Sequence, residues 1–506
     1  MKMKNIKYLS FIFLLVVFAS CSKFLEENPT GSLTPGSNVT SPEIARAFAN
    51  SAYIQLTTLD EGSGGYGGNT AELMEFMTGK ADGNAQTEGF RFYNLTYDAQ
   101  SFYIDTWWQG MYYGIANCNL ALQKIGDITL DTVTKQNMLA EVYTLRAFYY
   151  YYLVRMYGDV PKITDVVSDL NDVRPERSPL KEIYDEIIIP DLLKAEASSL
   201  PWQDVSGHVS MSAVKSLLAD VYLTYAGYPV QGGAEYYTQS AQRSKEVIDN
   251  GGYTLFSDYK DMTIPANKNK GEFIWQVQYA AGINNNDLTA KTLALYKRIS
   301  VYSDEFGGLV PTPQFVNSYP AGDHRKDERE FFYTWYPGNP KNFPAGDPRL
   351  DSVNLGGYYL YKWFDSTAVN STANSDLNYT IYRLADIMLM YAEASNRAEG
   401  GPNTDAIAYV NAIRTRAKLP VIAAMSQDDF EKEVWTERYL ELCYEGKTWF
   451  DMLRTRKVRN DITKNFDDFV GHTTTWGKTF TESQLLFPIP QREIDNNTNL
   501  TQNPGF

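Results

Sequence analysis

A chain of 506 residues with 43% hydrophobic content can bury a substantial core, and a charged fraction of 21% argues against wholesale disorder. Its 61 acidic and 46 basic residues give a formal net charge of −15, which disfavours nucleic acid and anionic lipid headgroups as partners. The 37 tyrosines, 25 phenylalanines and 9 tryptophans exceed what core packing requires, and they indicate a surface that recognises carbohydrate or peptide.

The first 20 residues are typical of an export signal rather than of a folded element. Lysines at positions 2, 4 and 7 precede an apolar run, Leu9–Ala19, that is too short to span a bilayer comfortably. The run ends at Ala19-Ser20-Cys21, which resembles a bacterial lipobox, so we predict that Cys21 is acylated and anchors the protein to a membrane. The alternative is ordinary secretion with Cys21 incidental. Residues 21–38, rich in Pro, Gly, Ser and Glu, are predicted to form a flexible tether.

Helical periodicity dominates residues 39–506, which we predict to fold as a single, mainly α domain. Helices are expected in pairs, at residues 41–54, 71–77, 102–125, 131–157, 179–198, 212–225, 234–249, 382–398, 404–417, 427–442 and 447–454. Ala147 before Tyr150 and Ala219 before Tyr222 repeat the small-then-large spacing of tetratricopeptide units, although the roughly 34-residue period of those units is absent.

The predicted secondary structure divides the domain into three parts. Residues 39–250 are predicted to hold the N-terminal helical repeats, and residues 381–506 the C-terminal helices and an extended tail. Between them, residues 251–380 are predicted to be a loop-rich insertion with short strands at 273–279 and 358–364. A second irregular loop is expected at residues 78–100, before the long helix at 102–125.

Four consecutive tyrosines, Tyr149–Tyr152, stand in the helix that ends at Gly158-Asp159-Val160-Pro161. They could form a binding platform or the packing surface of a buried helix. Apolar residues lie on nearly every side of this helix, a pattern typical of burial, so we predict that the tyrosines pack in the core.

Signals for catalysis are weak. The three histidines, His208, His324 and His472, lack ligand-like spacing, and the sequence contains no nucleophile turn, phosphate-binding loop or dinucleotide fingerprint. Residues 82–88 place oxygen side chains at alternate positions, but they lack the glycine and the glutamate of a calcium loop. We therefore predict no catalytic residues, no cofactor and no metal site, and we interpret Cys118 and Cys443 as buried thiols.

Aromatic loops are the better candidates for a binding site. A flat ring covers the C–H face of a sugar, while neighbouring amides or charged groups bind its hydroxyls. Several of these rings could instead fix the loops onto the helices, so both roles remain open. The candidate ligand-binding residues are Phe90, Phe92, Tyr93, Asn94, Tyr97, Asn285, Tyr296, Tyr302, Trp335 and Tyr336.

Motifs spread over nearly the whole chain resemble those of the SusD/RagB family, the outer-membrane nutrient-binding lipoproteins of Bacteroidetes. Leu384 stands where the family has Tyr, and Lys418 where it has Gly. The matching segments are Trp107 to Asn119, Arg146-Ala147 to Pro161, Arg383 to Ala394, Asn411 to Pro420, Glu437 to Asp451, Phe487 to Gln491 and Asn503 to Phe506.

The resemblance implies an α-helical fold of four tetratricopeptide-like helix pairs with a variable, loop-rich region that carries the ligand site. It also implies a lipid-anchored protein on the cell surface that caps a SusC-like TonB-dependent transporter and hands it oligosaccharide without catalysis. Arg146, Arg383, Glu437 and Arg438 are expected to form buried ion pairs rather than to touch ligand.

We therefore expect a non-catalytic glycan-binding lipoprotein that serves nutrient uptake and polysaccharide utilisation. The alternative is a peptide receptor of the same transporter class, which co-purified peptide would support. A glycoside hydrolase is the third hypothesis, and sustained product release from polysaccharides would be needed to support it.

Overall fold

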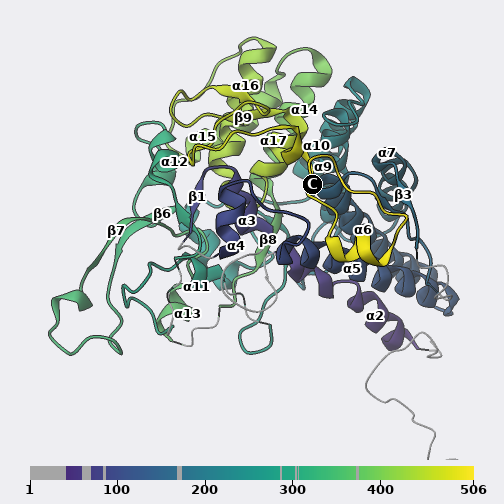
Figure 1. Cartoon of the computed structure of the whole chain (residues 1–506), viewed down its shortest axis with the longest axis horizontal. Helices are drawn as coiled ribbons and strands as arrows, with labels where there is room; N and C mark the ends of the chain where they lie inside the picture. The colour runs from purple at the N-terminus through teal and green to yellow at the C-terminus, as the bar shows by residue number, and fades with distance from the viewer. Residues whose placement is uncertain are drawn as a thin grey trace, which may run out of the picture.

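The computed structural model describes residues 41–59, 70–83, 87–167, 174–284, 286, 288–302, 305, 307–371 and 375–506. The predicted signal and tether at 1–38, and the candidate residue Asn285, lie outside these ranges. Helices form most of the described chain, and the loop-rich part lies to one side of them (Figure 1). The predicted mainly α class is confirmed. Across the described ranges, none of the helices combines the length and the hydropathy needed to cross a membrane.

The observed helices match most of the predicted ranges to within a few residues. They are α2 (Pro42–Ser51), α3 (Thr70–Met77), α4 (Thr87–Tyr93), α5 (Phe102–Asp127), α6 (Thr132–Tyr157), α7 (Leu180–Ile183), α8 (Ile189–Glu196), α9 (Met211–Ala226), α10 (Ala234–Asn250), α11 (Leu288–Thr292), α12 (Pro313–Ser318), α13 (Ser366–Asn370), α14 (Leu384–Glu399), α15 (Thr404–Arg416), α16 (Gln427–Glu441), α17 (Thr448–Thr455) and α18 (Gln491–Asn496).

The strands are short and join only in antiparallel pairs: β1 with β5, β2 with β3, β4 with β8, β6 with β7, and β9 with β10. Their bounds are β1 (Ala81–Asp82), β2 (Val160–Pro161), β3 (Arg177–Ser178), β4 (Phe273–Val277), β5 (Val310–Pro311), β6 (Phe332–Tyr336), β7 (Val353–Leu360), β8 (Tyr379–Arg383), β9 (Lys457–Arg459) and β10 (Phe466–Asp468).

Consecutive helices pack as pairs, as in tetratricopeptide folds. The pairs are α5 with α6, α9 with α10, and α14 with α15, and α10 also packs on α14. Close approach depends on small residues: a Cβ added at Gly114 of α5 would lie 2.5 Å from the Tyr149 ring of α6. The contact between α10 and α14 joins the N-terminal and C-terminal helices, so the insertion between them in sequence is displaced to one side.

Helix α6 is a core helix, which confirms the packing interpretation for three of its four consecutive tyrosines, while the fourth, Tyr152, is partly buried against the same core. Tyr149, Tyr150 and Tyr151 are all fully buried. Each hydroxyl makes a hydrogen bond: Tyr149 donates to the Ala52 carbonyl at 2.6 Å, Tyr150 donates to a carbonyl at 2.8 Å, and the Tyr151 hydroxyl lies 2.7 Å from that of Thr224. Buried hydroxyls without such partners would be costly, so these bonds are what permits tyrosine at core positions.

Buried ion pairs connect the helices, as the family resemblance implied. Arg146 of α6 donates two hydrogen bonds to Asp191 of α8, at 2.7 and 3.0 Å. Arg438 of α16 donates to Asp386 of α14 and to Asp451 of α17, both at 2.9 Å.

Arg383, at the junction of β8 and α14, is 1% exposed and bonds three glutamates. Among the described residues, Cys118 and Cys443 are buried free thiols, as predicted.

The predicted loop at 78–100 and the predicted extended tail are each partly wrong, because α4 forms in the first and α18 in the second. Neither short segment carries a strong periodic signal, and packing against the rest of the protein stabilises them. The helix predicted from residue 382 begins at Leu384, because Tyr379–Arg383 pairs with β4 as strand β8. The strand predicted at 358–364 is the end of β7, which stops at Leu360.

The insertion has a small hydrophobic core of its own, separate from the main core. Leu293, Ile299, Tyr333, Phe343 and Phe364 are among its members. The long connection between β6 and β7 projects from the body of the molecule, at the left of Figure 1. The insertion therefore presents loops to solvent from a packed base.

Candidate functional site: an aromatic loop face

The two predicted binding regions, the segment before α5 and the insertion, lie next to each other in the structure. Strand β1 pairs with β5 through Ala81–Pro311 and Asp82–Val310. Immediately after β1, a Cβ at Gly83 would lie 2.7 Å from the Gly308 carbonyl oxygen. The close approach of these backbones joins residues more than 200 positions apart in sequence. We use the name loop face for the surface formed by the loops next to the β1–β5 pair (residues 81–83 and 308–311) and by the β6–β7 hairpin (residues 332–360).

In the first region, α4 directs Phe90 outward and Phe92 inward. Phe90 is 48% exposed, whereas Phe92 is fully buried and packs against Trp107 at the start of α5. Tyr97 is buried as well, and its ring stacks on that of Phe92 at 5.1 Å. Phe92 and Tyr97 were predicted as ligand-binding residues. The structure corrects this, because both rings fill the core beneath the loop face.

The side chains of Tyr93 and Asn94 make hydrogen bonds within the protein. Tyr93 is 5% exposed, its ring lies 4.5 Å from that of Phe76, and its hydroxyl donates to Asp82 at 3.1 Å. The Asn94 amide donates to the Phe90 carbonyl at 2.8 Å. Tyr93 therefore supports the loop from below, and Asn94 fixes the end of α4 next to the exposed Phe90 ring.

In the insertion, Tyr296 and Trp335 are exposed, while Tyr336 and Tyr302 pack inward. Tyr296 is 79% exposed and Trp335 is 38% exposed. Tyr336 is 8% exposed, with its ring 4.8 Å from that of Phe364, and Tyr302 packs half-buried on the same small core. The prediction of Tyr336 as a ligand contact is corrected for the same reason as Phe92, since its side chain is part of a core.

The turn that carries Tyr296 is held in a strained conformation. Tyr296 and Arg298 both have positive φ, 57° and 61°, in the left-handed region that side chains disfavour. Glu305 holds this turn, because its carboxylate accepts the backbone N–H of Arg298 at 2.6 Å and that of Ser300 at 3.0 Å. Burial raises the pKa of Glu305, while these N–H groups act in the opposite direction. Strain of this kind gathers at binding sites, where it presents a side chain in a fixed position.

Trp335 stands beside a guanidinium that sequence patterns do not mark. The Arg329 guanidinium lies over the Trp335 ring, 4.1 Å from its centroid, and Arg329 also has a positive φ of 65°. Its Nε and Nη2 are buried and make no hydrogen bond to the part of the chain that the structure describes. Such donors are costly to leave unpaired, and an acceptor on a bound molecule would satisfy them. In the sequence, Arg329 follows Asp327 and Glu328 and looks like part of an ordinary surface charge run.

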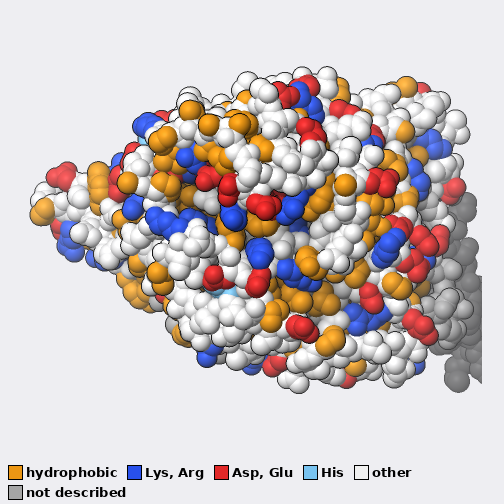
Figure 2. Space-filling model, turned by 90° about the horizontal axis from the view of Figure 1, so that it is seen from above, with side chains coloured by type: hydrophobic (Ala, Val, Ile, Leu, Met, Phe, Trp, Pro, Cys, Tyr) orange, Lys and Arg blue, Asp and Glu red, His pale blue; other side chains and the backbone are white. Residues whose placement is uncertain are grey.

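Exposed rings with adjacent donors and acceptors are the chemistry that binds sugars. Phe90, Tyr296 and Trp335 can each cover the apolar face of a sugar ring, and Asp82, Arg329 and their neighbours offer partners for its hydroxyls. On the face seen in Figure 2, basic and acidic side chains are interspersed with hydrophobic ones, rather than gathered by sign.

Comparison with family models and curated relatives agrees with the motif resemblance. A model described as "SusD family" matches residues 271–506, and a second, described as "Starch-binding associating with outer membrane", matches residues 23–223. SusD-like protein P2 of Formosa agariphila is 27% identical, with all of both chains covered. Starch-binding protein SusD of Bacteroides thetaiotaomicron is 23% identical, with 78% of this chain and 77% of that protein covered.

A solved structure gives a stronger match. The crystal structure of a SusD superfamily protein from Parabacteroides distasonis is 51% identical in sequence and superposes with a TM-score of 0.90. The match covers 94% of this chain and 100% of that chain. Both the helical scaffold and the insertion therefore have a counterpart in an experimental structure.

Proposed function

The chain belongs to the SusD family, and from that premise we propose that it binds oligosaccharide on its loop face and delivers it to a SusC-like TonB-dependent transporter of the outer membrane. Members of this family are non-catalytic glycan-binding proteins, and this chain is accordingly not an enzyme. The observation that carries the proposal is a difference in burial within the two predicted binding regions: the side chains of Phe90, Tyr296 and Trp335 are exposed, whereas those of Phe92, Tyr97 and Tyr336 are buried.

The names of relatives support glycan as the ligand class. One matching family model is described as starch-binding, and a curated relative is named a starch-binding protein. A neutral glycan also fits a protein of net charge −15, because sugar binding depends on ring contacts and hydrogen bonds rather than on net charge.

The membrane attachment is part of the same proposal. The family description associates such proteins with the outer membrane. We propose that residues 1–20 direct export, that Cys21 carries the lipid, and that residues 21–38 form the tether of the single domain at 39–506. The domain would then sit on the cell surface within reach of the transporter.

Binding is tested by screening the purified protein against a panel of oligosaccharides and measuring hits by calorimetry. We expect Tyr296→Ala and Trp335→Ala each to weaken a hit by about fivefold and the double variant to weaken it by about 25-fold, since ring contacts contribute on the order of 1 kcal/mol each. The matched control is Tyr113→Ala, which removes a ring that is 59% exposed on helix α5, outside both predicted binding regions. Binding by all variants alike, or peptide rather than glycan in the purified protein, would overturn the proposal.

Delivery is tested separately in outer membranes. The lipidated protein should co-purify with a TonB-dependent transporter, and Cys21→Ala should move it from the membrane fraction to the soluble fraction. If Cys21→Ala stays in the membrane, the anchor is wrong even where glycan binding holds. If no transporter co-purifies with the wild-type protein, the delivery step is wrong.

A further inference from the structure

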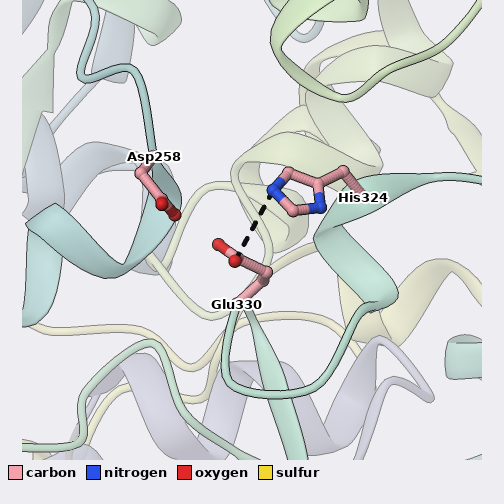
Figure 3. A group of neighbouring side chains, drawn as sticks. All are labelled: Asp258, His324 and Glu330. Carbon is pink, nitrogen blue, oxygen red and sulfur yellow. Dashed lines mark ion pairs between the residues drawn. The ribbon is translucent and has the colours of Figure 1, made fainter.

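Three side chains with metal-binding chemistry meet where the insertion adjoins the C-terminal helices. Asp258 precedes the short helix η5 (Tyr259–Thr263), His324 begins another, η7 (His324–Lys326), and Glu330 lies just before β6. Figure 3 shows the three side chains converging from separate segments. One ligand atom from each lies within 4.8 Å of the other two, and among the described residues this is the group of such side chains that meets so closely.

The imidazole of His324 is oriented for coordination. Its Nδ1 lies 2.7 Å from the Asp327 carboxylate and 3.0 Å from Lys418 Nζ, while the other ring nitrogen, Nε2, faces Glu330 (Figure 3). Metal-bound histidines are commonly held by a carboxylate in this way. Nε2 lies 3.5 Å from Glu330 Oε1, close to the roughly 3.3 Å between two ligands of a tetrahedral zinc ion.

Each of the two carboxylates keeps one buried oxygen that has no hydrogen-bond partner among the described residues. Glu330 is 8% exposed, and its Oε2 has no hydrogen-bond partner among the described residues. Asp258 Oδ1 is buried and unpartnered in the same sense, while Oδ2 pairs with Lys260 at 2.7 Å. Two facing carboxylates in a partly buried site repel each other unless a proton or a cation lies between them.

We propose that Asp258, His324 and Glu330 bind one divalent metal ion, with Zn²⁺ the best match. One imidazole nitrogen and two carboxylate oxygens are ligands that zinc accepts at four-coordinate sites, with water in the remaining position. Calcium takes six to eight oxygen ligands and does not favour imidazole, so it fits this set poorly. Two further basic groups adjoin the site, Lys260 at Asp258 and Lys418, whose Nζ lies 3.0 Å from His324 Nδ1.

The position of the site suggests a structural role. Arg325, adjacent to His324, is fully buried and pairs with Glu437 and Glu441 of α16. On the other side, Glu330 adjoins Arg329, which stacks on the exposed Trp335. All three ligands belong to the insertion, so a metal ion here would join three of its segments at the base of the β6–β7 hairpin, next to the ion pairs of Arg325 with α16. It would also fix the backbone next to Arg329.

The test uses the full chain, purified in detergent, treated with a chelator and titrated with zinc sulfate. Calorimetry should show one high-affinity site, and the ion should raise the Tm because it binds the folded state. His324→Gln and Glu330→Gln remove ligands with little change in shape, and each should weaken zinc binding at least tenfold.

The matched control is His472→Gln, since His472 also pairs with an aspartate, Asp467, at 2.9 Å. It should bind zinc as the wild type does. Zinc that neither binds nor raises the Tm would overturn the proposal, and so would unchanged zinc affinity in both the His324→Gln and Glu330→Gln variants. If Glu330→Gln stabilises the protein without metal and the wild type binds none, a shared proton joins the carboxyl groups instead. A variant that does not fold by circular dichroism is replaced by Asp258→Asn, for which the same loss is expected.

Discussion

The tyrosines of α6 and the aromatic residues of the loop face are the same kind of side chain in opposite settings. Tyr149–Tyr151 are fully buried, and each hydroxyl is bonded to another segment of the scaffold. Tyr296 is 79% exposed at the tip of a strained turn. Because both regions are rich in aromatic residues, the number of aromatic rings in a segment does not locate a binding site. What distinguishes the two regions is whether the backbone around the ring is packed against helices or held out in a loop.

The two regions also differ in how charge is used. In the scaffold, buried arginines such as Arg383 and Arg438 fix helix positions through several carboxylates each. On the loop face, Arg329 keeps two donors without protein partners in the described part of the chain. Variants that remove scaffold groups should therefore cost stability, and variants of the loop face should cost binding.

The largest expected effect comes from Arg383→Ala. The change leaves Glu272, Glu441 and Glu445 facing one another in a buried site, and breaking such a network costs about 3–5 kcal/mol or more. We expect a loss of at least about 4 kcal/mol in urea denaturation, or failure to fold. The control Arg349→Ala removes an exposed arginine paired with Asp347 and should change stability by less than about 0.5 kcal/mol. Equal effects for the two would refute the distinction between buried and surface pairs.

Tyr151→Ala should destabilise the protein by about 3 kcal/mol, because it opens a cavity in the core and removes the bond to Thr224. Tyr151→Phe keeps the ring and should cost about 1 kcal/mol. Both are measured by chemical denaturation, alongside ligand affinity. Affinity should be unchanged in any variant that folds, and a folded Tyr151→Ala protein that loses ligand would reverse the roles assigned to α6 and the loop face.

Acid should weaken the scaffold in a defined window. Burial by itself would raise the pKa of Asp451, but Arg438 and Arg454 outweigh it and lower the pKa to about 2. A lowered carboxyl pKa contributes stability that is present above the unfolded-state value near 3.8 and is lost as the pH falls towards 2.

We expect the free energy of unfolding to fall by about 2 kcal/mol from this residue alone across that window. Denaturation curves at pH 5, 4, 3 and 2.5 measure it. The Asp451→Asn variant should show a correspondingly smaller slope, and an identical slope in both proteins would contradict the assignment.

The smallest effect on stability is expected for Tyr296→Ala. An exposed side chain at a turn contributes little to folding, so the free energy of unfolding should change by less than about 0.5 kcal/mol. Glycan affinity, measured on the same preparation, should fall. A large loss of stability without loss of binding would move Tyr296 from the site to the supporting structure.

Much of the scaffold could be predicted from the sequence, because its helices are long and strongly periodic. The pattern from Asp131 to Tyr157 predicted α6 nearly to the residue, with Asp131 as its N-cap and Gly158 at its end. The motif arginines were expected in buried pairs and lie there. The short α4 and α18 were missed, since helices of seven and six residues depend on tertiary contacts rather than on local preference.

From the sequence, the candidate site could be predicted only as a set of aromatic and polar residues, without knowing which of them are exposed. Phe90 is exposed and Phe92 is buried because positions two apart on α4 point to different faces, and the sequence, which predicted a loop here, could not separate them. Arg329 carries no signal in the sequence, because its role depends on the Trp335 ring across a turn. The histidines were set aside for lack of spacing, yet folding brings His324 to Asp258 and Glu330.

The helical class, the family and the positions of the scaffold helices could be inferred from the sequence alone. Helix formation and the packing motifs depend on residues that lie close together along the chain. The tertiary structure decided which aromatic rings face solvent, how β1 and β5 join the two binding regions, and which carboxylates meet His324. These properties depend on contacts between residues far apart in sequence, and burial belongs to the packed whole rather than to any one segment.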